Sequence, residues 1–464
     1  MKNKFDEYKN QLRRILPIGK TFDMVERNIM VGGRDVYLYY IDAFTKDDVM
    51  QRIMSGFFQI SKEQMDGYIG ALDFIKNQIP YIEVTKENNI DIMVRLVLSG
   101  QTIMIIDGYA EAIAIDIRTY PVRGMAEPEK EKSLRGAKDG FVETMIFNTA
   151  LIRRRLRDPK LLFKAFNVGE KTKTDVAVGY IEGLADQAQI DKIMAKIKEL
   201  KVSGLTVGEQ SLIEALGKSG GFNPFPKVRY TQRPDVVAAH LAEGKFVIII
   251  DNSPTAIMLP TCIFDFMQDV DDYYFPLLTG NYFRLVRTLN MLVILFLTPL
   301  YMLIAEGDIA VPQFLHFLAP EAGYSIPLFL QFILLEVAID ALKLASLNTP
   351  SSLGMSLSVI GALILGEFSI TAGWFIPQTI LCMAVVALGG FTQPSIELGY
   401  AIKFMRLALI LGVAVFGLWG ALIALMINLL IMGTTKSLVG TYYLFPLIPF
   451  NWNQLKHLIF RTKS

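Results

Sequence analysis

The chain has 464 residues, of which 46 are basic and 45 are acidic, so its net charge at pH 7 is +1. This balance argues against a nucleic-acid partner, because proteins that bind nucleic acid carry a surplus of basic residues. Two cysteines, Cys262 and Cys382, support neither a disulfide framework nor a metal site, so we expect no cofactor and no metal.

Charged residues are distributed unevenly along the chain. Seven basic and seven acidic residues lie in the 177 positions from Thr288 onward, against 39 and 38 in the 287 positions before it. We therefore predict an α+β cytoplasmic region of two similar α/β subdomains, followed by a polytopic all-α transmembrane bundle of five or six spans. The expected segments are an N-terminal α/β subdomain (1–125), a linker with a connecting helix (126–158), a second α/β subdomain (159–265), a juxtamembrane segment (266–287), the transmembrane bundle (288–450) and a basic C-terminal tail (451–464).

The N-terminal segment is charged and has no apolar core, which is not the pattern of a signal peptide. We therefore expect the charged half of the chain to stay in the cytoplasm. Phe5, Tyr8 and Leu12 recur at helical spacing in this segment and predict a short amphipathic helix.

Two stretches of the charged half are similar to later ones. DIMVRLVLSGQTIMIID at 91–107 parallels DVVAAHLAEGKFVIIID at 235–251, and residues 39–54 parallel residues 179–194. The offsets are 144 and 140 residues, and both matches occur in the same order. We interpret this as two subdomains with the common order strand, helix, helix, hairpin. The alternative is chance similarity between two generic α/β units.

A helix predicted at about 139–157 carries four arginines: Arg153, Arg154, Arg155 and Arg157. Four arginines in five positions do not share one helical face. Some of them are expected either to pair with acidic residues between subdomains or subunits, or to contact anionic lipid. The nearby GEKTKTD lacks the spacing of a phosphate loop, and no Ser/His/Asp set is visible, so we expect no enzyme.

The apolar half begins after Arg284 and Arg287, which the positive-inside rule places in the cytoplasm. The loop with Glu397, Lys403 and Arg406 is expected on the same side by its charge. The final apolar stretch at 437–450 contains two prolines. It either re-enters the membrane and returns the basic tail to the cytoplasm, or leaves five spans with the tail outside. The predicted spans are 288–305, 326–343, 354–374, 377–391 and 407–435, the last one long enough to be tilted.

The second predicted span is apolar in its first half and then carries Glu336, Asp340 and Lys343. Spacings of four and three residues place all three on one helical face. Charges at this depth usually face a bundle interior or a water-filled path. These residues, and Glu367 in the third span, are therefore candidates for a pore or polar path. The alternative is a helix that leaves the membrane early, with Asp340 and Lys343 as a local ion pair.

Small residues in the third span form a candidate helix-packing surface. Gly361, Ala362 and Gly366 would let another backbone approach closely. The alternative is that they face lipid, where glycine and alanine are also common.

Four long blocks of the chain resemble a known family. LRGAKDGFVETMIFNTALIRRRLRDPKL, KTKTDVAVGYIEGLA, RYTQRPDVVAAHLAEGKFVIIIDNSPTAIMLP and DDYYFP are similar to the A-subunit family of bacterial spore germination receptors. NPFPKVRYTQRPD and DNSP are most similar to the stage V sporulation AF branch of that family. The resemblance implies a multi-pass protein of the spore inner membrane, with its N-terminal region cytoplasmic.

The same resemblance implies the function and the partners. A subunits are expected to assemble as homo-oligomeric rings, pentamers among the options, and to form a gated channel that releases small ions during germination. Other germination membrane proteins and membrane lipid are the further expected partners. Two alternatives remain open: a non-conducting scaffold for germination receptors, and a secondary transporter, although the spans show no internal repeat.

Overall fold

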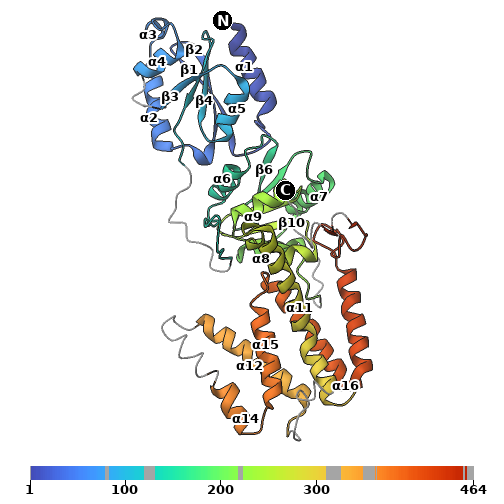
Figure 1. The fold of residues 1–464 in the computed structure, drawn as a ribbon. Helices are drawn as coiled ribbons and strands as arrows, with labels where there is room; N and C mark the ends of the chain where they lie inside the picture. The colour runs from blue at the N-terminus through green and yellow to red at the C-terminus, as the bar shows by residue number, and fades with distance from the viewer. Residues whose placement is uncertain are drawn as a thin grey trace. The chain divides into compact units, whose positions relative to one another are not determined.

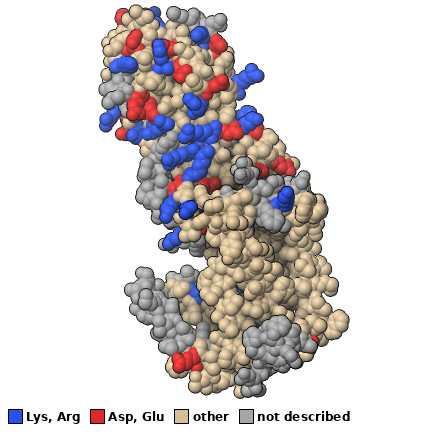
Figure 2. All heavy atoms as spheres, viewed as in Figure 1, with Lys and Arg blue, Asp and Glu red and all other residues tan. Residues whose placement is uncertain are grey.

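The computed structural model describes residues 2–78, 83–119, 131–217, 223–309, 325–348, 361, 363–452 and 455–456. These residues form two compact units: Met1–Ser219 with Val228–Pro260, and Gly220–Lys227 with Thr261–Ser464. Lys, Arg, Asp and Glu side chains crowd the surface of the first unit, whereas the visible surface of the second is mostly uncharged (Figure 2). We call them the sheet unit and the helical unit.

The first five-stranded sheet of the sheet unit is antiparallel throughout, with the strand order β1-β2-β4-β5-β3. Its helices form two layers, with α1 and α5 on one face and α2, α3 and α4 on the other (Figure 1). The bounds are α1 (Lys2–Ile15), β1 (Met24–Val31), β2 (Arg34–Ile41), η1 (Asp42–Phe44), α2 (Asp47–Phe57), α3 (Lys62–Asp66), α4 (Ala71–Gln78), β3 (Val84–Glu87), α5 (Ile90–Leu98), β4 (Thr102–Ile106) and β5 (Ala112–Ile115).

The two faces of this sheet follow from the alternation of side chains along a strand. In β2, Leu38 and Tyr40 pack against α2, α3 and α4, whereas Tyr37 and Tyr39 pack against α1 and α5. Both faces are apolar, so the strand is buried on both sides. The predicted amphipathic helix at the N-terminus is α1, which covers one of these faces.

The second sheet repeats the first strand for strand, with the order β6-β7-β9-β10-β8. The register repeats as well. Val36 pairs with Ile106 in the first sheet and Val176 pairs with Ile250 in the second, at the offsets of 140 and 144 residues. The prediction of two similar α/β subdomains is confirmed. The bounds are α6 (Met145–Arg155), β6 (Leu161–Val168), β7 (Thr174–Ile181), α7 (Gln187–Glu199), α8 (Gly208–Leu216), β8 (Arg229–Thr231), α9 (Pro234–Ala242), β9 (Phe246–Ile250) and β10 (Ala256–Leu259).

The arginines of α6 include one that joins the two subdomains. Arg153 is 1% exposed, and its guanidinium bonds both carboxylate oxygens of Asp23, one of them at 2.9 Å. It also donates to the Leu161 carbonyl at 3.1 Å. Arg155 pairs with Asp139 at 2.5 Å. Ion pairing between subdomains is thus confirmed for Arg153, and the proposed contact of the other arginines with anionic lipid stays a prediction.

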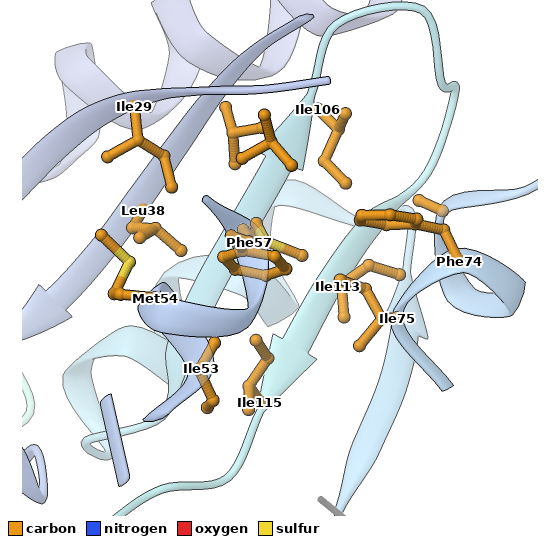
Figure 3. Packing of buried hydrophobic residues seen from close by; sticks show 14 of the residues in the cluster. Ile29, Leu38, Ile53, Met54, Phe57, Phe74, Ile75, Ile106, Ile113 and Ile115 are labelled. Atoms are coloured by element: carbon orange, nitrogen blue, oxygen red, sulfur yellow. The ribbon is translucent and has the colours of Figure 1, made fainter. Parts of the chain in front are cut away.

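The core between the first sheet and α2 has a large aromatic side chain at its centre. Phe57 is 1% exposed and is surrounded by Leu38, Met54, Ile113 and Ile115 (Figure 3). Its chain neighbour Phe58, at the end of the same helix, is 63% exposed. The pair therefore offers one substitution inside the core and an identical one outside it.

Phe57→Ala is expected to lower the free energy of unfolding of the sheet unit by about 3–5 kcal/mol, because it removes buried apolar area and leaves a cavity. Phe58→Ala is expected to change it by less than about 0.5 kcal/mol. Pulse proteolysis of the full chain in increasing urea, following cleavage within the sheet unit, measures both. Equal losses for the two variants would contradict this packing.

The helical unit consists mainly of helices. Within the described residues, two of them, α11 and α16, are long and apolar enough to cross a membrane, whereas α12 carries charges and α15 is shorter. The bounds are η2 (Ile263–Phe266), α10 (Asp271–Tyr274), α11 (Leu277–Ala305), α12 (Leu328–Asn348), the π-helical η4 (Leu363–Phe368), α14 (Ser369–Thr371), α15 (Pro377–Gly390) and α16 (Ile396–Thr434).

The long helix α16 reverses direction in its middle. Phe416 and Gly417 leave the helical conformation, and Gly417 has a φ of +56°. The Asn428 amide donates to the Met405 carbonyl at 3.1 Å. In a straight helix these two residues would stand about 34 Å apart at 1.5 Å per residue. The chain therefore folds back at Phe416 and Gly417.

The result is a helical hairpin with antiparallel arms at 396–415 and 418–434. The arms cross closely, because a Cβ on Gly420 would lie only 1.8 Å from the carbonyl oxygen of Gly412. The prediction of one tilted span at 407–435 is therefore wrong. The reversal occurs in an unbroken apolar run, where a glycine with positive φ makes the turn without any proline or polar residue to mark it.

The apolar stretch at 437–450 forms turns and no helix. Tyr443 is fully buried, with its ring centroid 5.7 Å from that of Phe225 and 6.1 Å from that of Phe266. Its carbonyl accepts from the Ile263 amide at 2.9 Å. This stretch therefore packs against residues that precede α11, and the choice between the re-entrant alternative and five spans stays a prediction.

Candidate polar site in the helical unit

Four charged side chains meet between α12 and the first arm of α16. The Glu336 carboxylate lies 2.6 Å from Arg406 Nη2 and 3.1 Å from Lys403 Nζ. Lys403 also bonds the Asp340 carboxylate. We call Glu336, Asp340, Lys403 and Arg406 the charged tetrad. Its two carboxylates and two cations balance, which is the arrangement that buried charges require.

Helical spacing explains why these side chains meet. Glu336 and Asp340 are four residues apart on α12, and Lys403 and Arg406 are three apart on α16, so each pair occupies one helical face. The two faces are packed against each other. Ser395, just before α16, caps the helix by accepting from the Leu398 amide at 3.2 Å, which sets the start of the helix that carries both bases.

The tetrad also reaches a third helix. Arg406 Nη1 donates to the Ile294 carbonyl of α11 at 3.1 Å, and the Arg406 side chain is only 3% exposed. The Glu336 side chain is 9% exposed. Arg406 therefore holds α11, α12 and α16 together at a point from which water is nearly excluded, where breaking an ion pair is costly.

A second polar contact joins α12 to α15, closer to the start of α12. The buried Gln331 side chain accepts from the Ile376 amide at 3.1 Å and from the Thr379 hydroxyl at 3.0 Å. It also donates to the Ile326 carbonyl at 2.8 Å. Gln331, Glu336 and Asp340 thus all make polar contacts with neighbouring helices.

The remaining candidates lie outside the tetrad. The Lys343 ammonium lies 5.7 Å from the centroid of the Phe391 ring, and Asp340 pairs with Lys403. The predicted local pair of Asp340 with Lys343 is therefore wrong: the acid turns toward the neighbouring helix. Glu367 is exposed, and its carbonyl accepts from the Thr371 hydroxyl at 2.7 Å.

The small-residue candidates behave differently from one another. A Cβ on Gly361 would lie 2.9 Å from Leu342 of α12, whereas one on Gly366 would meet nothing within 4 Å. Ala362 lies outside the described residues. Gly361 therefore lies close to α12, and the packing role of the other two stays a prediction.

Sequence reasoning missed Lys403 and Arg406 as members of the site. Both were expected in a cytoplasmic loop, but the structure places them in α16, which begins at Ile396. Two signals in the chain point to this arrangement. A helix-capping serine precedes them. Lys403 and Arg406 are three residues apart and the two acids on α12 are four apart, so each pair lies on one face of its helix.

The two ends of the helical unit differ in charge. Glu306 and Asp308 follow α11, and Asp308 lies against the α16 turn, where a Cβ on Gly417 would be 2.4 Å from its carboxylate. Arg284 and Arg287 lie near the start of α11, at the opposite end of that helix. Acidic residues thus follow the end of α11, and basic residues lie near its start.

The sequence profile of the Bacillus/Clostridium GerA spore germination protein family matches residues 10–464. The chain belongs to the GerA family. The resemblance seen in its sequence blocks is thereby confirmed. The match extends across both α/β subdomains, the charged tetrad and the C-terminal loop, so all the described elements except the first turns of α1 fall within it.

Several GerA-family relatives are similar over most of their length. Stage V sporulation protein AF of Bacillus subtilis (strain 168) is 36% identical over 96% of this chain and 90% of its own. The uncharacterized membrane protein YfkQ of the same organism is 30% identical over 95% and 86%. Spore germination protein KA, also from that organism, is 26% identical over 96% and 82%. These are names of sporulation, membrane and germination proteins, and none of them is the name of an enzyme.

One solved structure is also similar. The N-terminal domain of the A subunit of the Bacillus megaterium spore germinant receptor GerK3 is 25% identical, with a TM-score of 0.40. The likeness covers 54% of this chain and 91% of that one.

Proposed function

We propose that this GerA-family protein is a multi-pass protein of the spore inner membrane that forms a gated ion path and promotes ion release during germination. The observation that carries the proposal is the charged tetrad. Four charges at the junction of three helices, two of them nearly buried (Glu336 and Arg406), are costly in a membrane, and such residues often mark an ion path or a switch. In the described arrangement each carboxylate is paired, which corresponds to a closed state.

The hairpin of α16 supports six passages through the membrane. It divides the predicted fifth span into two arms, so the five spans predicted from the sequence become six, an even number. Both ends of the bundle then lie on one side, together with Arg284, Arg287 and the basic C-terminal tail. The sheet unit lies on that side too, in the cytoplasm.

The pairing of the charges supports a homo-oligomer. Within one chain the members of the tetrad pair with one another and join three helices, so we place a path wide enough for ions between copies of the chain. A ring, pentameric or of another number, lets each copy contribute α12 and its acids. Other germination membrane proteins and membrane lipid surround this ring.

The test is ion flux in liposomes that contain the purified full chain. The wild type is expected to pass monovalent ions passively, without saturation. Glu336→Gln leaves the tetrad with a net charge of +1, so the preference should shift toward anions. A change of about 1.4 kcal/mol suffices for a tenfold shift, and two unit charges 4 Å apart interact by about 4 kcal/mol at an effective dielectric constant near 20.

Glu367→Gln is the matched control, because it removes the same charge from an exposed position outside the tetrad. Its ion preference should equal that of the wild type. A wild type with no flux above protein-free liposomes would indicate a scaffold, in which the tetrad only fastens helices. Saturable flux would indicate a transporter.

A further inference from the structure

The chain crosses between the two units three times, at Ser219–Gly220, at Lys227–Val228 and at Pro260–Thr261. The Thr261 hydroxyl donates to the Lys227 carbonyl at 2.9 Å, so the residues on the helical side of the last two crossings are bonded to each other. Residues 261–276, which we call the elbow, follow and lead into α11.

The elbow is fastened to α11 by a buried ion pair. The Asp272 side chain is fully buried, and Arg287 holds it with two bonds, Nη1 to Oδ2 at 2.8 Å and Nη2 to Oδ1 at 3.2 Å. Arg284 Nε lies 3.5 Å from Oδ2. Arg287 also donates to the Met267 carbonyl at 3.1 Å. A carboxylate that accepts two hydrogen bonds from one guanidinium is held in one defined geometry.

A second contact fastens the elbow to the far end of the hairpin. Phe266 packs against Tyr443, which follows the second arm of α16, and the Asn223 amide donates to the Thr435 hydroxyl at 2.8 Å. The elbow and the short segment beside it therefore touch both the first and the last helix of the unit.

From Arg287 the contacts continue to the charged tetrad. The Arg287 carbonyl accepts from the Gln393 side chain at 3.4 Å, in the connection between α15 and α16. Seven residues further along α11, the Ile294 carbonyl accepts from Arg406. A continuous set of contacts thus joins Asp272 through α11 to one member of the tetrad.

We propose that the Asp272–Arg287 pair is a latch that couples the elbow, where the chain enters the helical unit, to the charged tetrad. The buried pair transfers a displacement of the elbow to α11. The shift of Ile294 then changes the geometry of Arg406, and with it the pairing of Glu336. This coupling exists whether or not the tetrad lines an ion path.

Hydrogen–deuterium exchange of the full chain in lipid nanodiscs tests the latch. Asp272→Asn removes the charge and keeps the size of the side chain. Amide exchange is expected to rise near the elbow and also in 328–348 and 396–410, by at least about fivefold, the lower end of typical coupling between sites. Asp269→Asn is the matched control, since its carboxylate lies 3.7 Å from Arg287 and is 36% exposed. Its distal exchange should equal that of the wild type.

A rise confined to the elbow and the first turns of α11 would overturn the latch. If Asp272→Asn does not accumulate, Arg284→Gln, which removes the partner at 3.5 Å, carries the same expectation at smaller amplitude. Ion flux measured on the same preparations separates the two proposals. If amide exchange changes in 328–348 and 396–410 but no variant passes ions, the latch is supported and the ion path is excluded. If ions pass but exchange in these segments does not change, the ion path is supported and the latch is excluded.

Discussion

Arg406→Met is expected to lower the free energy of unfolding of the helical unit by about 3–5 kcal/mol, because it leaves the Glu336 carboxylate with only Lys403 in a site from which water is nearly excluded. Methionine keeps an unbranched side chain of similar apolar character to the arginine stem, so most of the loss reports the missing charge and its hydrogen bonds. Lys343→Met is the matched control, since Lys343 lies outside the tetrad over the Phe391 ring. Its effect should stay below about 1 kcal/mol.

The double variant Glu336→Met with Arg406→Met sharpens this test. It removes one acid and one base and leaves Asp340 paired with Lys403. Replacing both members of a buried ion pair with apolar side chains is often neutral, so the double variant should recover most of the stability that the single one loses. Equilibrium unfolding in mixed detergent micelles measures the wild type, the single variants Glu336→Met and Arg406→Met, and the double variant, with Lys343→Met as the control. A double variant that is less stable than either single one would show that these charges do not act as a pair.

Gly420→Ala is expected to destabilise the hairpin, because the new Cβ would lie 1.8 Å from the Gly412 carbonyl oxygen and the two arms would have to separate. Overpacking of this kind typically costs about 1–3 kcal/mol, and backbone on the opposing side yields less than a side chain does. The closeness of the two arms depends on glycine at both positions.

The matched control is Gly433→Ala in the same arm, where the nearest atom, Leu444 Cδ1, is 3.9 Å from the new Cβ. Alanine is favoured over glycine in a helix by about 1 kcal/mol, so this variant should be neutral or stabilising. The two substitutions are chemically identical and have expected effects of opposite sign. Thermal unfolding in detergent measures the stability of both variants. An increase in stability on Gly420→Ala substitution would contradict the hairpin.

Much of the sheet unit could be predicted from the sequence. Segments that recur at offsets of 140 and 144 residues carry the same apolar pattern, and the same pattern buries the same faces in both sheets. The boundaries of α6 were less accurate: it begins at Met145, not near Asp139. Hydrophobic periodicity and repeated segments can be read directly from the order of residues, so they predict the elements and their order well.

Only the two acidic residues of the charged tetrad could be predicted from the sequence. Spacing placed Glu336 and Asp340 on one face of one helix, and this is how they lie in the structure. The partners, Lys403 and Arg406, are more than 60 residues away and belong to a helix expected to start after them. Periodicity indicates which face of a helix is polar, but it does not indicate which other helix that face meets.

The sequence alone thus determined the division into a charged and an apolar half, the duplicated subdomain, and the charged face of α12, because composition, repetition and helical spacing depend only on the order of residues along the chain. Three features were decided only by the tertiary structure. These are the pairing of Arg153 with Asp23 across 130 residues, the partners of Glu336, and the reversal of α16 at Gly417. Each depends on how elements distant in sequence pack together, and a glycine that turns an apolar run leaves no polar mark in the sequence.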